Sequence, residues 1–208
     1  IVDNWFVSGM RGTGSCDFAA HDVFVPAAHV HRFVDTPPTQ SNVLYRLPVA
    51  SIYPLTVSVV PLGIARGAIS SFIGLAGTTS RQGTSAALRD REIVQAEVGR
   101  VEALHHAARA FLIEAITELM TATDIGGDRL IRARALFRAA CAHAAESAVR
   151  IVDMLSAVAG TVSIFESAPL ERRARDVHAA AKHIAMSPNC YVVAGRICMG
   201  LDAGVARF

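Results

Sequence analysis

The stretch that decides the fold spans residues 90–123 and reads DREIVQAEVGRVEALHHAARAFLIEAITELMTAT. Apolar residues recur in it at spacings of three and four, which places them on one face of an α-helix. The residues of this apolar stripe are Val94, Val98, Val101, Ala108, Leu112, Ala115 and Leu119. The pattern predicts one long amphipathic helix that packs against other helices.

The same period predicts further helices on both sides of this stretch. Their expected ranges are about 52–76, 128–160, 169–185 and 188–200. Pro61 is expected to kink the first of them, and Asp128 is suited to be the N-cap of the second. Long helices joined by short turns are typical of an up-and-down bundle, so the predicted fold class is mainly α.

The first 47 residues differ in character from the rest. Val23-Phe24-Val25 is a β-prone run that ends at Pro26, and Gly9 and Gly12 lie in the stretch before it. Two or three strands with turns are expected here, followed by a proline-containing linker. We therefore divide the chain into residues 1–47, a β fragment with a linker, and residues 48–208, a helical bundle.

Composition excludes several classes of function. Charged residues make up 18% of the chain, against about 25% in an average globular protein, and the net charge of +2 gives no basic surface for nucleic acid. The most apolar run, Leu55–Ala65, is interrupted by Pro61 and stopped by Arg66, which is short for a membrane span of about 20 residues. The surplus of apolar residues, 52% of the chain, instead predicts an oligomer or contact with a further domain.

The cysteines and histidines do not suggest a metal site. The four cysteines form no CxxC pair, which predicts free thiols and a cytoplasmic protein. His29 with His31, and His105 with His106, lack the cysteine or carboxylate partners that a metal site requires. We expect no bound metal.

Two segments resemble the acyl-CoA dehydrogenase superfamily. Trp5, the run GMRGTGS at 9–15 and the run DVFVP at 22–26 resemble the end of the middle β-domain. The run PLERRARD at 169–176 resembles the P-x-E-R-x-x-R-D motif of the C-terminal helical domain. The two lie in the family's order and at about its separation. The resemblance implies the C-terminal part of a flavin-dependent oxidoreductase, with the N-terminal helical domain and most of the β-domain outside this chain.

One position departs from the dehydrogenases. Their catalytic glutamate lies nine residues after the arginine of R-D, which corresponds to Ile184, and an isoleucine cannot accept a proton. Arg175-Asp176 followed after six residues by His183 resembles instead the signature of flavin-dependent monooxygenases built on the same fold. The resemblance implies that His183 is the catalytic residue, acting on a substrate proton or on activated oxygen. An imidazole can take and give protons near neutral pH.

The same resemblance implies the cofactor and the partners. Reduced FMN or FAD would come from a separate flavin reductase, and the substrate would be an aromatic or other small apolar molecule. In the homo-oligomer that the family forms, Arg81 and Ser163 correspond to positions that contact the flavin of a neighbouring subunit. Ala157 replaces a glutamine common in the dehydrogenases, which leaves FMN and FAD as alternatives.

Two alternatives accompany this interpretation. The first is an acyl-CoA dehydrogenase whose base has moved to the preceding helices, for example to Glu114 or Glu118. The second is a non-catalytic oligomerisation fragment, because the chain opens with Ile1 and the resemblance leaves two domains outside it.

Overall fold

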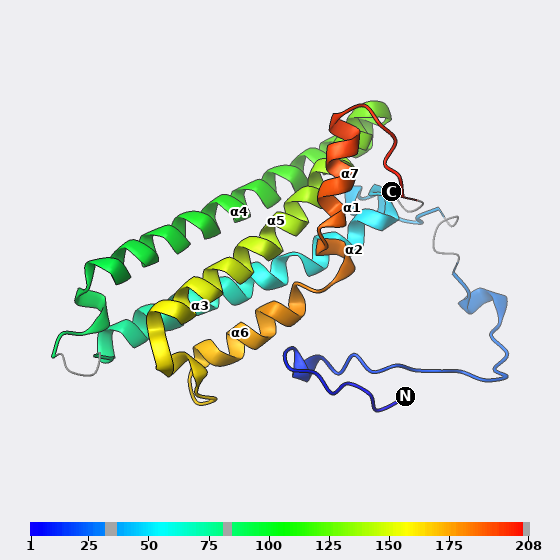
Figure 1. Cartoon of the computed structure of the whole chain (residues 1–208). Coiled ribbons are helices and arrows are strands. Elements are labelled where there is room, and N and C mark those ends of the chain that lie inside the picture. The colour runs from blue at the N-terminus through cyan, green and yellow to red at the C-terminus, as the bar shows by residue number, and fades with distance from the viewer. Residues whose placement is uncertain (32–36, 81–84, 206–208) are drawn as a thin grey trace.

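A computed structural model of the chain describes residues 1–31, 37–80 and 85–205. From Val43 onward the described chain is predominantly helical (Figure 1). The helices are α1 (Val43–Arg46), α2 (Val49–Val57), α3 (Val59–Thr78), α4 (Glu92–Ile125), α5 (Gly127–Ala159), α6 (Pro169–Ala180) and α7 (Asn189–Cys198). Short 3-10 turns are η1 (Arg11–Thr13), η2 (Ala27–His29), η3 (Leu88–Asp90), η4 (Gly160–Ile164) and η5 (Ile184–Met186). The predicted mainly α class is confirmed.

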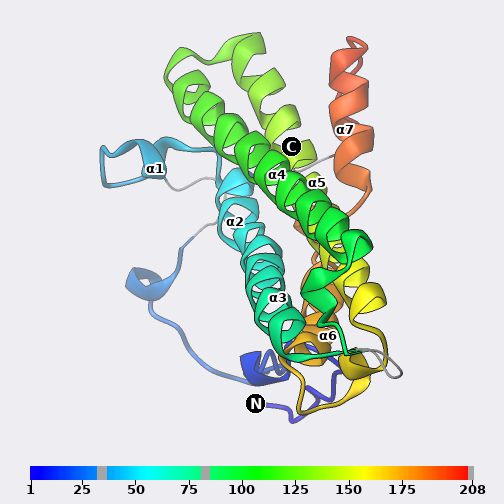
Figure 2. The ribbon, with the colours of Figure 1, turned by 90° about the vertical axis from the view of Figure 1, so that its left-hand side faces the viewer.

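Helix α5 lies at the centre of the bundle. It packs against α3, α4, α6 and α7, and α6 lies along both α3 and α5 (Figures 1 and 2). Buried alanines such as Ala140, Ala144 and Ala148 line α5. Because the distance between packed helices depends on the side chains at their contact, these small residues let several helices approach α5 closely.

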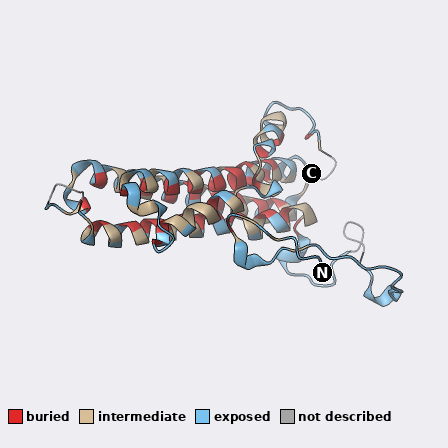
Figure 3. Ribbon diagram, turned by 60° about the horizontal axis from the view of Figure 1, so that its bottom comes forward, coloured by how far each residue is buried: buried red, intermediate tan, exposed pale blue. Residues whose placement is uncertain are grey.

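The core consists of two hydrophobic clusters placed along the bundle. One cluster includes Phe72 of α3 and Leu155 of α5, and the other includes Leu119 of α4 and Phe137 of α5. Buried residues lie along the inside of the bundle, whereas the N-terminal segment is exposed (Figure 3). The apolar stripe predicted for 90–123 is therefore correct, since its residues form the buried face of α4.

The first predicted helix is broken earlier than expected. Instead of a kink at Pro61, α2 ends at Val57 and α3 begins at Val59. Pro61 has no N–H to donate to the carbonyl of Val57, four residues earlier, and its ring crowds that carbonyl. The interruption therefore lies one turn before the proline.

The N-cap predicted at Asp128 is also wrong. Gly126 is the N-cap of α5, and Asp128 lies inside the first turn, where its negative charge favours the helix dipole. Gly126 and Gly127 have φ values of 75° and 56°, which residues with a Cβ adopt at a cost. These two glycines let α4 turn directly into α5.

The two or three strands expected near the N-terminus are not formed among residues 1–31 and 37–47, which are the described part of this segment. Within the described residues the backbone pairing of this segment is the isolated bridge between Val2 and Asp17. Phe24, in the β-prone run, is 88% exposed, and Figure 1 shows residues 17–31 running away from the bundle. A strand needs a neighbour for its backbone hydrogen bonds, and none of the described residues supplies one here. The division of the chain at residue 47 stays a prediction.

Two helical stretches, Val49–Thr78 and Gly127–Ile164, are long and apolar enough to cross a membrane by length and composition. The first stretch meets these criteria although Pro61 and Arg66 interrupt the apolar run, so the expectation that this run is short for a membrane span was wrong by length and composition. Both stretches supply residues of the two core clusters, which accounts for their hydropathy.

A buried histidine couples folding to pH. His105 of α4 is 6% exposed, its Nε2 lies 3.2 Å from the Leu62 carbonyl, and its Nδ1 has no hydrogen-bond partner among the described residues. Burial lowers the pKa of His105 below its usual value of 6.5, with the nearby Arg66 and His106 charges acting in the same direction. The unfolded chain therefore binds more protons between the two pKa values, so stability is lost as the pH falls below about 6.5.

We expect a His105→Phe variant to lose less unfolding free energy than the wild-type protein between about pH 8 and about pH 5. Denaturant unfolding at a series of pH values measures this difference. His106→Phe is the matched control, because the neighbouring His106 side chain is 76% exposed. Equal acid sensitivity in the wild-type protein and the His105→Phe variant would show that His105 is not the coupled group.

Candidate active site

His183 lies in the connection between α6 and α7, not within a helix. The predicted helix over 169–185 ends at Ala180, and the chain then turns into η5, for which His183 is the N-cap. Val177 of α6 and Met186 of η5 are both buried, so the connection is anchored at its two ends. His183 and Ile184 between these anchors are exposed, Ile184 by 82%.

The His183 ring is held by the backbone. The Ala185 N–H donates to Nδ1 of His183 over 3.2 Å, while the ring itself faces the outside of the bundle. His178 lies within α6, whereas His183 follows the end of this helix. The Nε2 of His178 instead lies 2.9 Å from Oδ1 of Asp153 on α5.

The two segments that carried the resemblance contact one another. The Met10 N–H donates to Oδ1 of Asp176 over 2.7 Å, and Nη1 of Arg175 donates to the Ser8 carbonyl over 2.9 Å. A Cβ added at Gly9 would lie 2.0 Å from the Arg175 carbonyl oxygen. The glycine of the first motif is therefore required by the close approach of the N-terminal turn to α6.

Arg175 is fixed from both sides. Besides the Ser8 carbonyl, it donates two hydrogen bonds to Glu171, of 2.6 and 2.9 Å, and this bidentate contact holds the pKa of Glu171 below its usual range. The Arg-Asp pair of the motif thus docks the N-terminal segment onto α6. Helix α6 ends at Ala180, and His183 follows three residues later.

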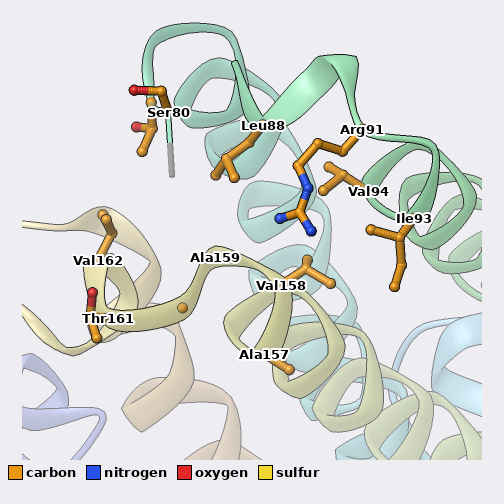
Figure 4. Close-up of a pocket in the computed structure, with 12 residues that line it drawn as sticks. Ser80, Leu88, Arg91, Ile93, Val94, Ala157, Val158, Ala159, Thr161 and Val162 are labelled. Atoms are coloured by element: carbon orange, nitrogen blue, oxygen red, sulfur yellow. The ribbon is translucent and has the colours of Figure 1, made fainter. Parts of the chain in front are cut away.

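A cavity of about 530 Å³ lies near the start of α6, whereas His183 follows the end of this helix. The α3–α4 connection meets the end of α5 at the cavity (Figure 4). Figure 4 shows the Arg91 side chain extending into it, opposite Val158 of α5. Ser80 and Thr161 contribute hydroxyl groups, and Ile93 contributes an apolar wall. None of the described residues makes a side-chain hydrogen bond or ion pair with Arg91. The cavity therefore combines an available cation, hydroxyl donors and an apolar surface.

Local backbone geometry shapes this cavity. The Leu88 N–H donates to the Thr79 carbonyl over 2.8 Å, which closes the α3–α4 connection. Gly160, with φ 67° and ψ −145°, ends α5 in a conformation that a residue with a Cβ rarely adopts. The chain can therefore turn sharply from α5 into η4 beside the cavity.

Of the two predicted cofactor residues, Ser163 lies near this cavity. Arg81 is outside the described residues, and it directly follows Ser80, which lines the cavity. Ser163 lies in η4, where its hydroxyl donates to the Gly160 carbonyl over 2.7 Å, and the neighbouring Thr161 and Val162 line the cavity instead.

Arg91 was missed by the sequence analysis, although a signal existed. It is the residue immediately before α4, and a cation at a helix N-terminus is unfavourable with respect to the helix dipole. A residue that opposes a local preference in this way often has a role elsewhere in the structure.

The sequence matches a known family. Residues 55–188 match the family described as "Acyl-CoA dehydrogenase, C-terminal domain", and the chain belongs to this family. The chain is 30% identical to indole-3-acetate monooxygenase of Pseudomonas putida over 201 residues, which cover 96% of this chain and 51% of that protein. It is 28% identical over 216 residues to a flavin-dependent monooxygenase, oxygenase subunit HsaA, of Mycobacterium tuberculosis, which covers 98% of this chain and 54% of the relative.

Solved structures agree with this relationship. The crystal structure of a 3-HSA hydroxylase from Rhodococcus sp. RHA1 superposes with a TM-score of 0.85 at 26% identity, covering 98% of this chain and 56% of the other. The bundle is therefore the C-terminal bundle of an acyl-CoA dehydrogenase fold, as the resemblance implied. The chain spans about half the length of the relatives that it matches.

Proposed function

We propose that this chain is the C-terminal part of the oxygenase component of a flavin-dependent monooxygenase. The reaction would insert one oxygen atom of dioxygen into an aromatic or other small apolar substrate. Reduced flavin, FMN or FAD, would come from a separate reductase, a proposal supported by the name of the relative described as an oxygenase subunit. The observation that carries the proposal is an anchored histidine at position 183 beside an aliphatic residue at position 184.

The residues at this position favour oxygen chemistry over dehydrogenation. Removal of a proton from an acyl-CoA requires a base, and the side chain of Ile184 has no group that accepts one. Of the relocated bases considered above, Glu118 fits poorly. It accepts two hydrogen bonds from Arg129, of 2.8 and 3.0 Å, which hold its pKa below the usual range.

The cavity at the end of α5 fits part of a flavin. A guanidinium binds phosphate well, and apolar walls fit an aromatic ring system. We propose that Arg91, together with Arg81 and the η4 turn that contains Ser163, contacts the cofactor there. When bound, the flavin would supply the reaction with dioxygen, while the residues of this chain would bind and orient it.

The position of the cavity supports a homo-oligomer. The cavity lies near the start of α6 and His183 lies beyond its end, and a helix of 12 residues is about 18 Å long. We propose that the cavity of one subunit serves the flavin whose ring lies near His183 of a neighbouring subunit. Exposed apolar residues on α4 and α5, such as Ile113 and Leu136, would be covered in such an assembly.

We expect an Arg91→Ala variant of the full-length protein to bind reduced flavin about 10- to 150-fold more weakly, because a charge-assisted hydrogen bond contributes about 1.5–3 kcal/mol. Anaerobic titration with reduced FMN and reduced FAD measures the affinity. Arg100→Ala is the matched control, since Arg100 is an exposed arginine of α4 paired with Glu97 outside the cavity. Equal affinity of the two variants for both flavins would remove Arg91 from the proposed site.

A further inference from the structure

The contact between Ala185 and His183 decides which nitrogen of the imidazole carries the proton. A backbone N–H is a permanent donor, so the ring nitrogen that faces it must offer a lone pair. The Ala185 N–H donates to Nδ1 over 3.2 Å, which leaves the proton of the neutral ring on Nε2. A protonated Nδ1 would place two N–H groups against each other.

The amide of Ala185 is itself firmly placed. The Met186 N–H donates to the His183 carbonyl over 2.9 Å, and Sγ of Cys190 donates to the Ala185 carbonyl over 3.4 Å. Met186 and Cys190 are buried, and η5 packs against α5 and α2. The donor therefore cannot turn away from the ring without disturbing the start of α7.

The surroundings of His183 differ from those of His178. Nε2 of His178 lies 2.9 Å from a carboxylate oxygen of Asp153. No acidic side chain of the described residues contacts His183. Of these two histidines of the α6–α7 region, His183 is the one with a backbone N–H facing a ring nitrogen.

We propose that the Ala185 amide holds His183 as the neutral Nε2–H tautomer, so that its Nε2 contributes a hydrogen-bond donor to the reaction centre and not a proton acceptor. The second half of this statement rests on the proposed oxygenase function. Ala185 is then a positioning residue, acting through its backbone. A substrate proton must be taken by another group, while His183 donates to a developing negative charge on the oxygen or the substrate.

The tautomer is tested by nitrogen NMR. We expect ¹⁵N-histidine spectra of the full-length protein at about pH 8, where an ordinary imidazole is neutral, to show for His183 a protonated Nε2 and an unprotonated Nδ1. The signals are assigned by their loss in His183→Asn. A protonated Nδ1, or an exchanging mixture, would overturn the proposal without affecting the proposed function.

Two substitutions test the role of the ring. The amide of His183→Asn occupies the place of Nδ1 and can still accept from Ala185, whereas the amide of His183→Gln reaches the place of Nε2 and can donate. We expect turnover with reduced flavin to stay within about tenfold of wild type in His183→Gln and to fall about 100-fold or more in His183→Asn, as for the loss of a donor to a developing charge. Equal, large losses in both variants, with flavin binding intact, would indicate a proton acceptor and overturn the proposal.

Flavin titration separates this proposal from the function on which it rests. If the wild-type protein and both variants fail to bind reduced flavin, the proposed oxygenase function is wrong. The NMR measurement still decides the tautomer in that case, because it needs no cofactor.

Discussion

His183→Ala in the full-length protein is expected to lower oxygen-incorporating turnover by about 10²–10³-fold, the usual cost of losing one donor to a developing charge. The affinity for reduced flavin should change little, because the proposed phosphate contacts lie at the other end of α6. Turnover is measured with reduced flavin and a phenolic or indole substrate, together with the release of hydrogen peroxide.

Loss of the ring also removes the acceptor for the Ala185 N–H, which costs about 1 kcal/mol as for other N-caps. The melting temperature of the variant therefore has to be measured beside its activity. Lys182→Ala is the control, since Lys182 is the exposed residue next to His183 and is expected to retain wild-type turnover. Unchanged turnover in a folded His183→Ala variant would remove His183 from the reaction.

Gly9→Ala is expected to detach the N-terminal turn from α6. The added Cβ would lie 2.0 Å from the Arg175 carbonyl oxygen, which is backbone and cannot move aside. The turn must shift, and the bond from the Met10 N–H to Asp176 is lost. We expect a destabilisation of about 1–3 kcal/mol, as for other overpacked sites, and faster hydrogen exchange at the Met10 amide by about tenfold or more.

Gly12→Ala provides the matched control for this prediction. A Cβ at Gly12 would meet nothing within 4 Å, although this glycine belongs to the same turn. Its unfolding free energy and its exchange at Met10 should stay close to wild type. Similar behaviour of the two variants would mean that the contact between the turn and α6 does not hold the segment in place.

The helices could be predicted from the sequence, and their ends could not. The spacing of Val94, Val101 and Leu112 fixes the buried face of α4, because a helix can bury such a stripe in only one orientation. The start of α5 depends on the positive φ values of Gly126 and Gly127, which outweigh the capping preference of Asp128. The strands predicted near Phe24 require partners that the described residues do not supply.

The roles of the candidate site residues stay predictions. The resemblance to flavin-dependent monooxygenases made His183 the catalytic candidate, and the structure adds that α6 ends at Ala180, so that the histidine lies in an anchored connection. The end of α6 is set by tertiary contacts, since Val177 and Met186 are buried on either side of it. The period of apolar residues in the sequence does not reveal these contacts. Arg91 became a candidate only when the fold brought the start of α4 to the end of α5.

The central claim is that the full-length protein is an oxygenase, and labelled dioxygen tests it most directly. The protein is mixed with chemically reduced flavin, a panel of phenolic and indole substrates, and ¹⁸O₂, and the products are analysed by mass spectrometry. We predict one ¹⁸O atom in the product and dependence of this incorporation on His183. A parallel assay contains oxidised flavin and a panel of acyl-CoA substrates. Acyl-CoA-dependent reduction of the flavin in this assay, with no ¹⁸O in any product of the first assay, would contradict the account.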